Sequence, residues 1–567
     1  MKLYRLALPA LLACSPLAAH PPTMLLMGGS YQTCSSLDDD DCRADQRDFT
    51  GARQPPLYRI NPAVFDDILD AGYWAARPDA PAPERIVALL RRAQSQAKGA
   101  SLDAERLGEL LESADVDTWN RLLTLERDLI LSAFELPQLD AHDKRLIEGV
   151  RLDGDNTGHD ATLFRRFVAE AAKRSPGKRP RIAFVTSASN DSFYYVDLNA
   201  GLLEQAGAEV VWWPVDAAMN AAVNRGRGCD ALIPLRRELL SQLGRERVYP
   251  DLHARQAAAC RDPEALAALP DQVQGLFFDG GDQWLHRETF FDADGRPNRW
   301  LRAVRAAFAR GELVVSGTSA GAAIQSGPGG MVTNGLSTNA LANGAIAVRG
   351  SMPEGCERAM RCPIPLREDD LTWWHGGGFG LLGDYLVDTH VAERRRELRL
   401  ITLMTDIAAT PAPPVQAGIG VDEASGLLVQ LQDGGLQLEA LGQSGAWWFE
   451  RPAPRTAAGG WSLRGHYLAP GASLFWRDGR MEAPDAGMPT DLRTADIRPG
   501  GDALQPKVLR SAVWDMAGGN HAHTRLEALG FRLDVRLTPE SRIWQGPQGQ
   551  QGVTELELQL KPGADTD

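Results

Sequence analysis

Five short apolar runs, each ended by small or polar residues, set the strongest constraint on the fold of this chain. The runs are TMLLMGG (23–29), RIAFVTSAS (181–189), AEVVWWPV (208–215), GLFFDGGDQ (275–283) and GELVVSGTSAG (311–321). Between them lie helix-like segments at 159–174, 197–207 and 299–311. Strands that alternate with helices form a parallel sheet with helices on both faces, and ligands gather at the carboxyl ends of its strands. We therefore predict an α/β fold with its functional site at those strand ends.

Two insertions and a change of pattern divide the rest of the 567 residues. Residues 52–150 carry apolar residues at helical spacing and are predicted to be a helical insertion, and a second insertion lies at 225–270. After about residue 427, short alternating or aromatic runs separated by Gly and Pro indicate β structure. The predicted units are a signal segment and linker at 1–22, a first strand at 23–51, the helical insertion at 52–150, the main α/β domain with a β-rich end at 151–490, and a C-terminal extension at 491–567.

The N-terminal segment is typical of an export signal. Lys2 and Arg5 precede an apolar run that is too short to span a bilayer. The sequence LLAC, ending at Cys14, resembles a bacterial lipobox, in which the cysteine is acylated after cleavage. Ordinary cleavage after Ala19 is the alternative. We expect a lipoprotein of the cell envelope, in the outer membrane or periplasm, or an extracellular protein; Ser15 after the cysteine suits an outer membrane.

The other six cysteines form three local pairs along the chain: Cys34 with Cys42, Cys229 with Cys260, and Cys356 with Cys362. An exported chain meets an oxidising compartment, where disulfides persist. Six free thiols are the alternative. None of the spacings is a CxxC and no histidine stands at ligand spacing beside them, so a zinc site is not expected.

The net charge of −14 and the pI near 5.3 argue against general nucleic-acid binding, which needs a concentrated basic surface. The same charge suits a protein that handles a cationic substrate. We expect no cofactor and no metal. A homodimer stays open.

The stretch VVSGTSAGAA places Ser319 between Gly317 and Gly321, directly after a buried strand and before small residues that can begin a helix. A nucleophile elbow requires this context, because the sharp turn lifts the serine Oγ above the sheet and aims the next backbone N–H, that of Ala320, at an oxyanion. A tight turn that needs small residues is the alternative.

An α/β-hydrolase esterase is one hypothesis for this serine, since HGGG at 375–378 matches a lipase-type oxyanion motif. In that fold the HGGG loop precedes the nucleophile, whereas here it follows Ser319. The motif order therefore argues against an esterase.

Two later segments offer partners for Ser319. In VDTHVAERRRELRL (387–400), His390 follows Asp388 and begins an apparent helix that carries three arginines, Arg394, Arg396 and Arg399. In AGIGVDEASGLLV (417–429), Asp422 and Glu423 stand between two apolar runs, so Glu423 ends a strand. A solvated basic face and a simple turn are the respective alternatives.

Together, LLMGGSYQTCSS, RIAFVTSAS, FFDGGDQ, SGTSAGAAIQS, GGGFGLL and the two segments above resemble the serine peptidases of family S51, and within it the cyanophycinases more than the aspartyl dipeptidases. The resemblance spans about 24–35 and 150–475. It implies a fold like that of class I glutamine amidotransferases. It also implies a catalytic triad of Ser319 as nucleophile, His390 as general base and then acid, and Glu423 as the group that orients the imidazole.

The resemblance further implies hydrolysis of cyanophycin, a polyaspartate whose side chains carry arginine, to β-Asp-Arg dipeptides. Planar guanidiniums match carboxylates, so Arg394, Arg396 and Arg399 are expected to bind the aspartyl part, and acidic groups the arginine. Gln283 and Asp388 correspond to substrate-contacting positions of the family. From loop type alone, the N–H groups of Ala320, Gly280 and Gly281 are the expected oxyanion donors.

Thr389 stands where a cyanophycinase usually has glutamine, and threonine cannot offer an amide's donor and acceptor together. This departure leaves the substrate open, with Thr389 among the expected substrate contacts. The alternatives are a related peptidase acting on other aspartyl or isoaspartyl peptides, and a non-catalytic binding module of the same fold. The expected partners are a peptide polymer and, through the lipid anchor, a membrane.

Overall fold

The computed structural model describes residues 20–411, 415–488, 497–519 and 521–563, so the predicted lipidation site Cys14 lies outside the described residues. Its main sheet has the strand order β18-β17-β14-β13-β1-β7-β6-β4-β5. The five predicted runs form its parallel part: β1 (Thr23–Met27), β4 (Arg181–Val185), β5 (Glu209–Trp212), β6 (Gly275–Phe278) and β7 (Val314–Thr318). The predicted α/β class with a parallel sheet is confirmed for these strands.

Antiparallel strands extend this sheet beyond β1, which the sequence pattern did not predict. They are β13 (Ser425–Gln432), β14 (Gly435–Gly442), β17 (Leu474–Arg477) and β18 (Arg480–Glu482). The sheet is therefore mixed, because part of the β-rich region after residue 427 pairs with the first strand of the chain.

Helices cover both faces of the parallel strands, because alternate side chains of a strand point to opposite faces. Leu25 and Met27 of β1 pack in one core with α7 (His159–Ala172) and α8 (Val196–Gln205). Met24 and Leu26 pack in another core with the helices of the opposite face, which are α9 (Ala217–Val223), α10 (Leu232–Leu240), α13 (Pro263–Ala268), α14 (Gln283–Phe290) and α15 (Arg299–Ala309). The predicted helices at 159–174, 197–207 and 299–311 correspond to α7, α8 and α15.

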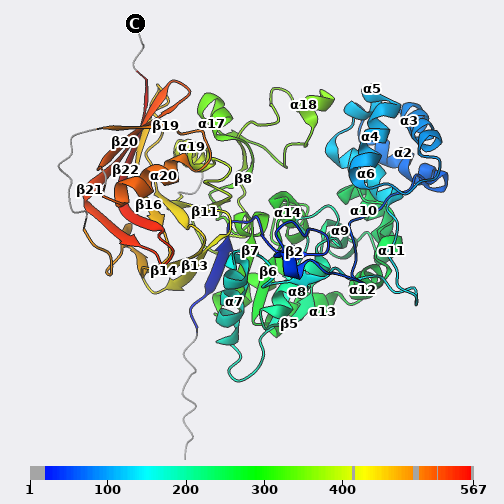
Figure 1. Cartoon of the computed structure of the whole chain (residues 1–567), viewed down its shortest axis with the longest axis horizontal. Coiled ribbons are helices and arrows are strands. Elements are labelled where there is room, and N and C mark those ends of the chain that lie inside the picture. Colours follow the sequence, from blue (N-terminus) through cyan, green and yellow to red (C-terminus); the bar gives the residue numbers. More distant parts are fainter. Residues whose placement is uncertain (1–19, 412–414, 489–496, 520, 564–567) are drawn as a thin grey trace, which may run out of the picture.

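A second sheet stands beside the main one and carries the C-terminal residues (Figure 1). Its order is β11 (Tyr385–Thr389), β12 (Ala417–Val421), β15 (Ala446–Glu450), β16 (Trp461–Leu468), β22 (Gln551–Pro562), β21 (Phe531–Gln545), β20 (His523–Ala528) and β19 (Arg498–Asp502). Buried residues of α19 (Glu397–Ala408) and α20 (Val508–Ala517) share its core. The strands β19 to β22 thus continue a sheet that begins with β11, and β11 ends beside His390.

The region expected to be a helical insertion forms a unit with its own core, seen at the upper right of Figure 1. Its helices are α1 (Phe65–Ile68), α2 (Ala71–Ala75), α3 (Pro83–Ala97), α4 (Ala104–Ala114), α5 (Val116–Asn120) and α6 (Thr124–Phe134). The unit is fixed to α11 (Arg245–Val248) by a buried ion pair in which Arg245 Nη1 lies 2.7 Å from Glu135 Oε2.

The three predicted cysteine pairs are all disulfides: Cys34–Cys42, Cys229–Cys260 and Cys356–Cys362. The second links η3 (Cys229–Ala231), the short helix before α10, to the end of α12 (Pro250–Cys260) within the second predicted insertion. Within the described ranges, no helix combines the length and apolar character that crossing a membrane requires.

Candidate active site

Ser319 occupies a sharp turn between β7 and the short helix α16 (Ala320–Ala323). Its backbone has φ 50° and ψ −114°, in the left-handed half of conformational space that residues with a side chain rarely adopt. A Cβ on Gly321 would lie 2.2 Å from the Phe278 carbonyl oxygen, so only glycine lets the turn approach β6 this closely. The strained turn and the small neighbour are what a nucleophile elbow requires.

The structure brings the hydroxyl of Ser319, the imidazole of His390 and the carboxylate of Glu423 into one hydrogen-bonded chain. His390 Nε2 lies 2.7 Å from Ser319 Oγ, and His390 Nδ1 lies 2.7 Å from Glu423 Oε1. A carboxylate can only accept, so Nδ1 carries the proton and Nε2 is free to accept one from the serine. This is the arrangement in which a serine hydroxyl is activated as a nucleophile.

The strand order explains why residues so far apart in sequence meet here. β11 and β12 are parallel neighbours, and their last residues Thr389 and Val421 are paired, so His390 and Glu423 follow adjacent strand ends. The His390 N–H donates to the Gly28 carbonyl at 3.1 Å, and the Ser319 N–H donates to the Met27 carbonyl at 3.0 Å. The end of β1 therefore joins the elbow of the main sheet to the edge of the second sheet.

The environment keeps the imidazole neutral and the carboxylate ionised. Burial lowers the pKa of His390, and the cations Arg394 and Arg396 lower it further, against the hydrogen bond with Glu423, which raises it. The hydrogen bond from His390 lowers the pKa of Glu423 to about 2. Near neutral pH the pair is thus a neutral base beside a carboxylate, as general-base catalysis requires.

The expected oxyanion donors surround the serine. Gly280 and Gly281 follow β6, and a Cβ on Gly280 would lie 3.4 Å from Ser319 Cβ. Among the described residues, no protein acceptor receives the backbone N–H of Gly280, Gly281 or Ala320. These N–H groups are therefore available to a bound oxygen.

A buried histidine that the sequence analysis missed fixes the Gly280 peptide. His286 Nε2 lies 3.1 Å from the Asp279 carbonyl oxygen, and His286 Nδ1 lies 2.8 Å from Ser187 Oγ. Burial lowers the pKa of His286 to about 4, so the ring is neutral. In a trans peptide the N–H points opposite to the carbonyl, so holding Asp279 O also orients the Gly280 N–H. Sequence alone gave no signal for this contact beyond the position of His286 shortly after GGDQ.

Ser319 opens into a pocket of about 660 Å³ whose wall combines apolar side chains with charged groups of both signs. Arg394, Arg396 and Arg399 line it together with Ser319. Other lining groups are acidic: Asp128, Asp282, Glu288, Glu354, Glu368 and Asp369. The pocket therefore offers both cations and carboxylates to a ligand.

Two of the predicted substrate contacts bind each other. Arg399 Nε and Nη2 lie 2.8 and 2.6 Å from the two carboxylate oxygens of Asp388, and both residues are buried. Burial alone would raise the pKa of Asp388, yet Arg399 holds it below its usual range. The Arg399–Asp388 pair therefore forms part of the pocket wall. Most hydrogen-bonding groups of the two side chains already have partners within the protein.

The other two arginines, Arg394 and Arg396, have fewer contacts within the protein than Arg399 and keep donors for a ligand. Arg394 is half exposed at its side chain, with Nε 3.4 Å from Glu423 Oε1. Arg396 Nη1 donates to the Thr389 carbonyl at 3.0 Å, and its buried Nε has no partner among the described residues. Burial, together with Arg399, lowers the pKa of Arg396 to about 9. Arg396 Nη1 also lies 4.0 Å from Asp388 Oδ1, so Nε is the part of this guanidinium that is available to an anion.

The remaining predicted substrate contacts, Gln283 and Thr389, also line the pocket. Gln283 begins α14 and donates its side-chain N–H to the Val332 carbonyl at 2.7 Å, which leaves the amide oxygen free of a protein donor among the described residues. Thr389 is buried at the end of β11 and also lines the pocket.

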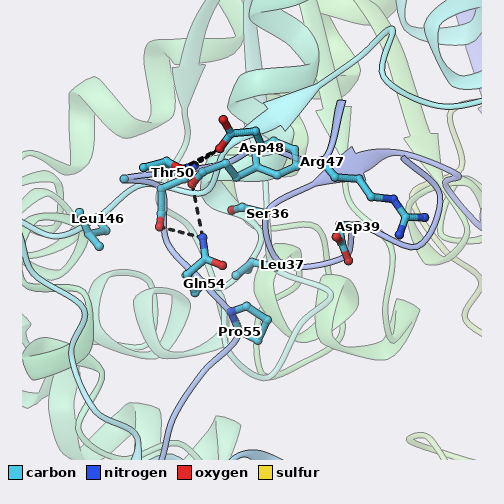
Figure 2. A pocket seen from close by; sticks show the side chains of 12 residues that line it. Ser36, Leu37, Asp39, Arg47, Asp48, Thr50, Gln54, Pro55 and Leu146 are labelled. Carbon is cyan, nitrogen blue, oxygen red and sulfur yellow. Dashed lines mark hydrogen bonds between the residues drawn. The ribbon is translucent and has the colours of Figure 1, made fainter. Parts of the chain in front are cut away.

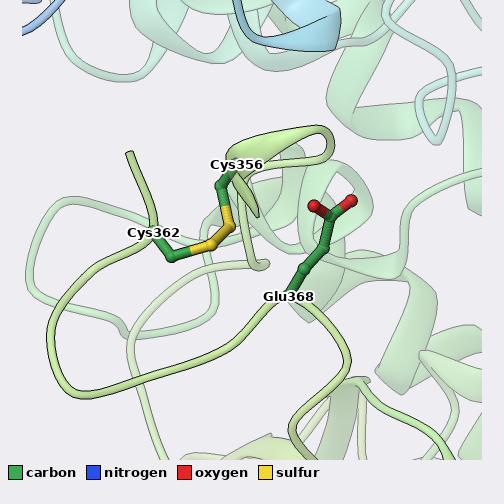
Figure 3. A group of neighbouring side chains, drawn as sticks. All are labelled: Cys356, Cys362 and Glu368. Carbon is green, nitrogen blue, oxygen red and sulfur yellow. A yellow bond between two sulfur atoms is a disulfide. The ribbon is translucent and has the colours of Figure 1, made fainter. Parts of the chain in front are cut away.

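Residues of the helical unit and residues that flank a disulfide-linked loop line the pocket, and the two segments contact each other. Arg361 Nη1 lies 2.6 Å from the fully buried Glu126 Oε2 in α6, and the Thr124 N–H donates to the Glu354 carbonyl at 3.0 Å. The loop contains α18 (Cys356–Ala359) and is closed by Cys356–Cys362, with Glu368 beside the disulfide (Figure 3). Because the two sulfurs are bonded to each other, this group offers no thiolate to a metal.

Another hollow, of about 590 Å³, lies in the N-terminal segment that follows β2 (Cys34–Ser35) (Figure 2). Its polar groups bond to one another: Thr50 Oγ1 donates to Asp48 Oδ1 at 2.7 Å, and Gln54 Nε2 donates to the Ala52 carbonyl at 3.2 Å. It shares no lining residue with the Ser319 pocket.

No model of a known protein family matches this chain. A solved structure, that of a peptidase from an acI-B1 Actinobacterium, is similar over 57% of this chain and 90% of its own, with 14% sequence identity and a TM-score of 0.28. The fold and the site described above define a mixed α/β protein with a hydrogen-bonded Ser–His–Glu array whose serine lines a pocket of mixed charge.

Proposed function

We propose that this chain is a serine-type peptidase with a class I glutamine amidotransferase-like fold, of the cyanophycinase type within family S51. The hydrogen-bonded chain from Ser319 Oγ through His390 to Glu423 carries the proposal, with 2.7 Å at each contact. A strained elbow, an ionised carboxylate and unoccupied N–H donors beside the serine support the same assignment.

The proposed mechanism follows from these groups. Ser319 Oγ attacks the scissile carbonyl carbon while His390 Nε2 takes its proton, and the N–H groups of Ala320 and Gly280 hold the oxyanion. The imidazolium, stabilised by Glu423, then gives the proton to the leaving amine nitrogen as the C–N bond breaks. Water attacks the resulting ester by the same path, which releases the acid and restores the serine.

The charge distribution of the pocket supports cyanophycin as the substrate. Arg394 and Arg396 lie close enough to His390 to lower its pKa, where they suit the carboxylates of a polyaspartate. Asp128 and Glu354 line the same pocket, and neither side chain has a cationic partner among the described residues, so they suit the guanidinium of the arginyl group. Export with a lipid anchor at Cys14 would place such an enzyme where it meets polymer released by other cells.

Short aspartyl or isoaspartyl peptides are the second candidate substrate class. Thr389 in place of glutamine favours it, and so does the contact between α6 and the disulfide-linked loop, because both segments adjoin the pocket and limit the room for a polymer.

A digest of cyanophycin followed by mass spectrometry tests the assignment. We expect β-Asp-Arg dipeptides as the product. Cleavage of free aspartyl and isoaspartyl dipeptides with intact cyanophycin selects the second candidate. Binding of the polymer with no hydrolysis of any peptide would support the hypothesis of a non-catalytic binding module. Faster turnover of p-nitrophenyl esters than of every peptide would support the esterase hypothesis.

The pH dependence of hydrolysis tests the role of His390. Its lowered pKa means that Nε2 accepts a proton at neutral pH and becomes protonated only in acid. We expect kcat/KM to rise with pH, with a midpoint below the ordinary histidine value of about 6.5, and then to level off. A midpoint above 7 would show that another group acts as the base.

Gly29 is a residue that the sequence pattern did not single out as part of the site. Its φ is 96°, and a Cβ there would lie 2.3 Å from His390 Cε1 and 3.0 Å from Ser319 Cβ. We expect Gly29→Ala to lower kcat about 100-fold, because the methyl group displaces the imidazole from the serine. Gly51→Ala is the matched control, since Gly51 has φ 83° and open space around it. Equal losses in both variants would assign the effect to backbone strain.

A further inference from the structure

A residue of the C-terminal helix α20 reaches the loops that carry His390 and Glu423. Arg510 Nη1 lies 2.8 Å from Asp422 Oδ2, 2.8 Å from Glu393 Oε1 and 3.0 Å from Ser444 Oγ. Asp422 directly precedes Glu423 in the sequence, and Glu393 lies three residues after His390. Arg510 therefore contacts a neighbour of each of the two residues.

Each of the two carboxylates that Arg510 contacts accepts a backbone N–H of the other loop. Asp422 Oδ1 accepts the N–H of Ala392 at 3.0 Å, which ties the Glu423 loop to the His390 loop. Glu393 Oε2 accepts the N–H of Glu423 at 3.0 Å, which ties the loops the other way. These two bonds flank the contact between His390 and Glu423 and restrict the separation of the loops.

Both carboxylates depend on Arg510 for compensation of their charge. Asp422 is fully buried, and burial raises its pKa to about 6 even with Arg510 beside it. Within the described part of the chain, no cation other than Arg510 forms an ion pair with Asp422 or Glu393. A buried carboxylate that loses its cation either takes up a proton or draws in water, and both weaken its hold on a backbone N–H.

We propose that Arg510 is a positioning residue for the His390–Glu423 pair, and that the C-terminal residues are therefore part of the active-site structure. The proposal rests on the proposed function. Backbone contacts agree with it, since the Lys507 N–H at the start of α20 donates to the Ala392 carbonyl at 2.7 Å. The strands after residue 491 thus serve as the support that carries α20 to the site.

The test compares Arg510→Met, Arg510→Lys and Arg525→Met with the wild-type full chain. Arg525 is the matched control because it pairs with Asp534 at 2.9 Å in the same C-terminal region, and among the described residues it forms no ion pair or hydrogen bond with the His390 or Glu423 loops. The readouts are kcat and KM for the peptide substrate, and the second-order rate constant for inactivation by phenylmethanesulfonyl fluoride, which reports Ser319 reactivity without a chosen substrate.

We expect Arg510→Met to lower kcat and the inactivation rate constant about tenfold or more, with KM within about twofold of wild type. Arg510→Lys should restore much of the loss, because all three contacts go to one nitrogen and an ammonium has three donors. Arg525→Met should match wild type in both readouts. A loss in KM alone, or equal losses for Arg510→Met and Arg525→Met, would overturn the proposal.

A second variant covers the case in which Arg510→Met fails to fold. Glu393→Gln removes one carboxylate at a partly exposed site, and its inactivation rate constant should fall about fivefold or more. A wild-type rate in this variant overturns the positioning role. If wild-type protein reacts with the sulfonyl fluoride yet hydrolyses no aspartyl peptide, the proposed substrate is wrong while the Arg510 comparison still stands; if it does neither, both proposals are wrong.

Discussion

Ser319→Ala protein is expected to hydrolyse its peptide substrate at least about 10⁴-fold more slowly than wild type. The substitution removes the oxygen that attacks the carbonyl carbon, and the 2.7 Å hydrogen bond to His390 Nε2 is lost with it. Alanine keeps the Cβ of serine and lacks only its Oγ, so it fits at this turn. The melting temperature should therefore stay close to that of wild type. Product release measured by mass spectrometry, beside thermal unfolding, checks both expectations.

Ser316→Ala is the matched control for this result. Ser316 lies on the same strand, β7, and its buried hydroxyl donates to the Leu25 carbonyl at 2.9 Å, with no contact to His390. We expect this variant to keep its turnover and to lose about 1 kcal/mol of the free energy of unfolding. Undiminished hydrolysis by Ser319→Ala would remove Ser319 from the mechanism, whatever the control does.

The elements that sequence could predict are those with a local signal. Each parallel strand of the main sheet is a short apolar run ended by small residues, and the elbow at Ser319 is marked by its glycines. The cysteine pairs were also predictable, because the members of each pair are close in sequence. For these features the nearby residues alone carry the information.

The features that sequence did not predict depend on contacts between distant segments. Nothing in β22 indicates that it pairs with β16 and so joins the sheet that begins at β11. The pairing of Arg399 with Asp388 was equally hidden, since a row of arginines on a helix gives no sign of which one is already bonded. Sequence reasoning therefore named several residues of the pocket, such as Ser319 and the three arginines, but it could not say which of them remain free for a ligand.

The same distinction applies to the triad. The order of the motifs suggested which three residues act together, yet their contact depends on β11 and β12 lying side by side and on β1 reaching the elbow. Gly29 lies in one of the motifs but nothing there showed that it packs against His390, and His286 lies in none of them. Such supporting residues are set by the close packing of the site, which only the structure describes.

Glu423→Gln should cause a loss of about 10⁴-fold in kcat, close to that of the serine variant, although glutamine has almost the same shape. The carboxylate now accepts the Nδ1 proton at 2.7 Å and keeps Nε2 free. An amide has no charge to stabilise the imidazolium, and its N–H₂ group favours the tautomer with the proton on Nε2, which cannot accept the serine proton.

The pH profile separates this role from simple damage to the fold. The hydrogen bond with Glu423 raises the pKa of His390, so its loss should move the midpoint of the residual activity to lower pH. Glu450→Gln is the matched control, because Glu450 Oε1 lies 3.1 Å from His466 Nε2 in another His–Glu pair of the same sheet. Glu450 pairs with Ala417, at the opposite end of β12 from the end that leads to Glu423. We expect that variant to keep both kcat and the midpoint. An unchanged midpoint with wild-type kcat in Glu423→Gln would mean that Glu423 does not orient His390, and the hydrogen-bonded chain would then end at the imidazole.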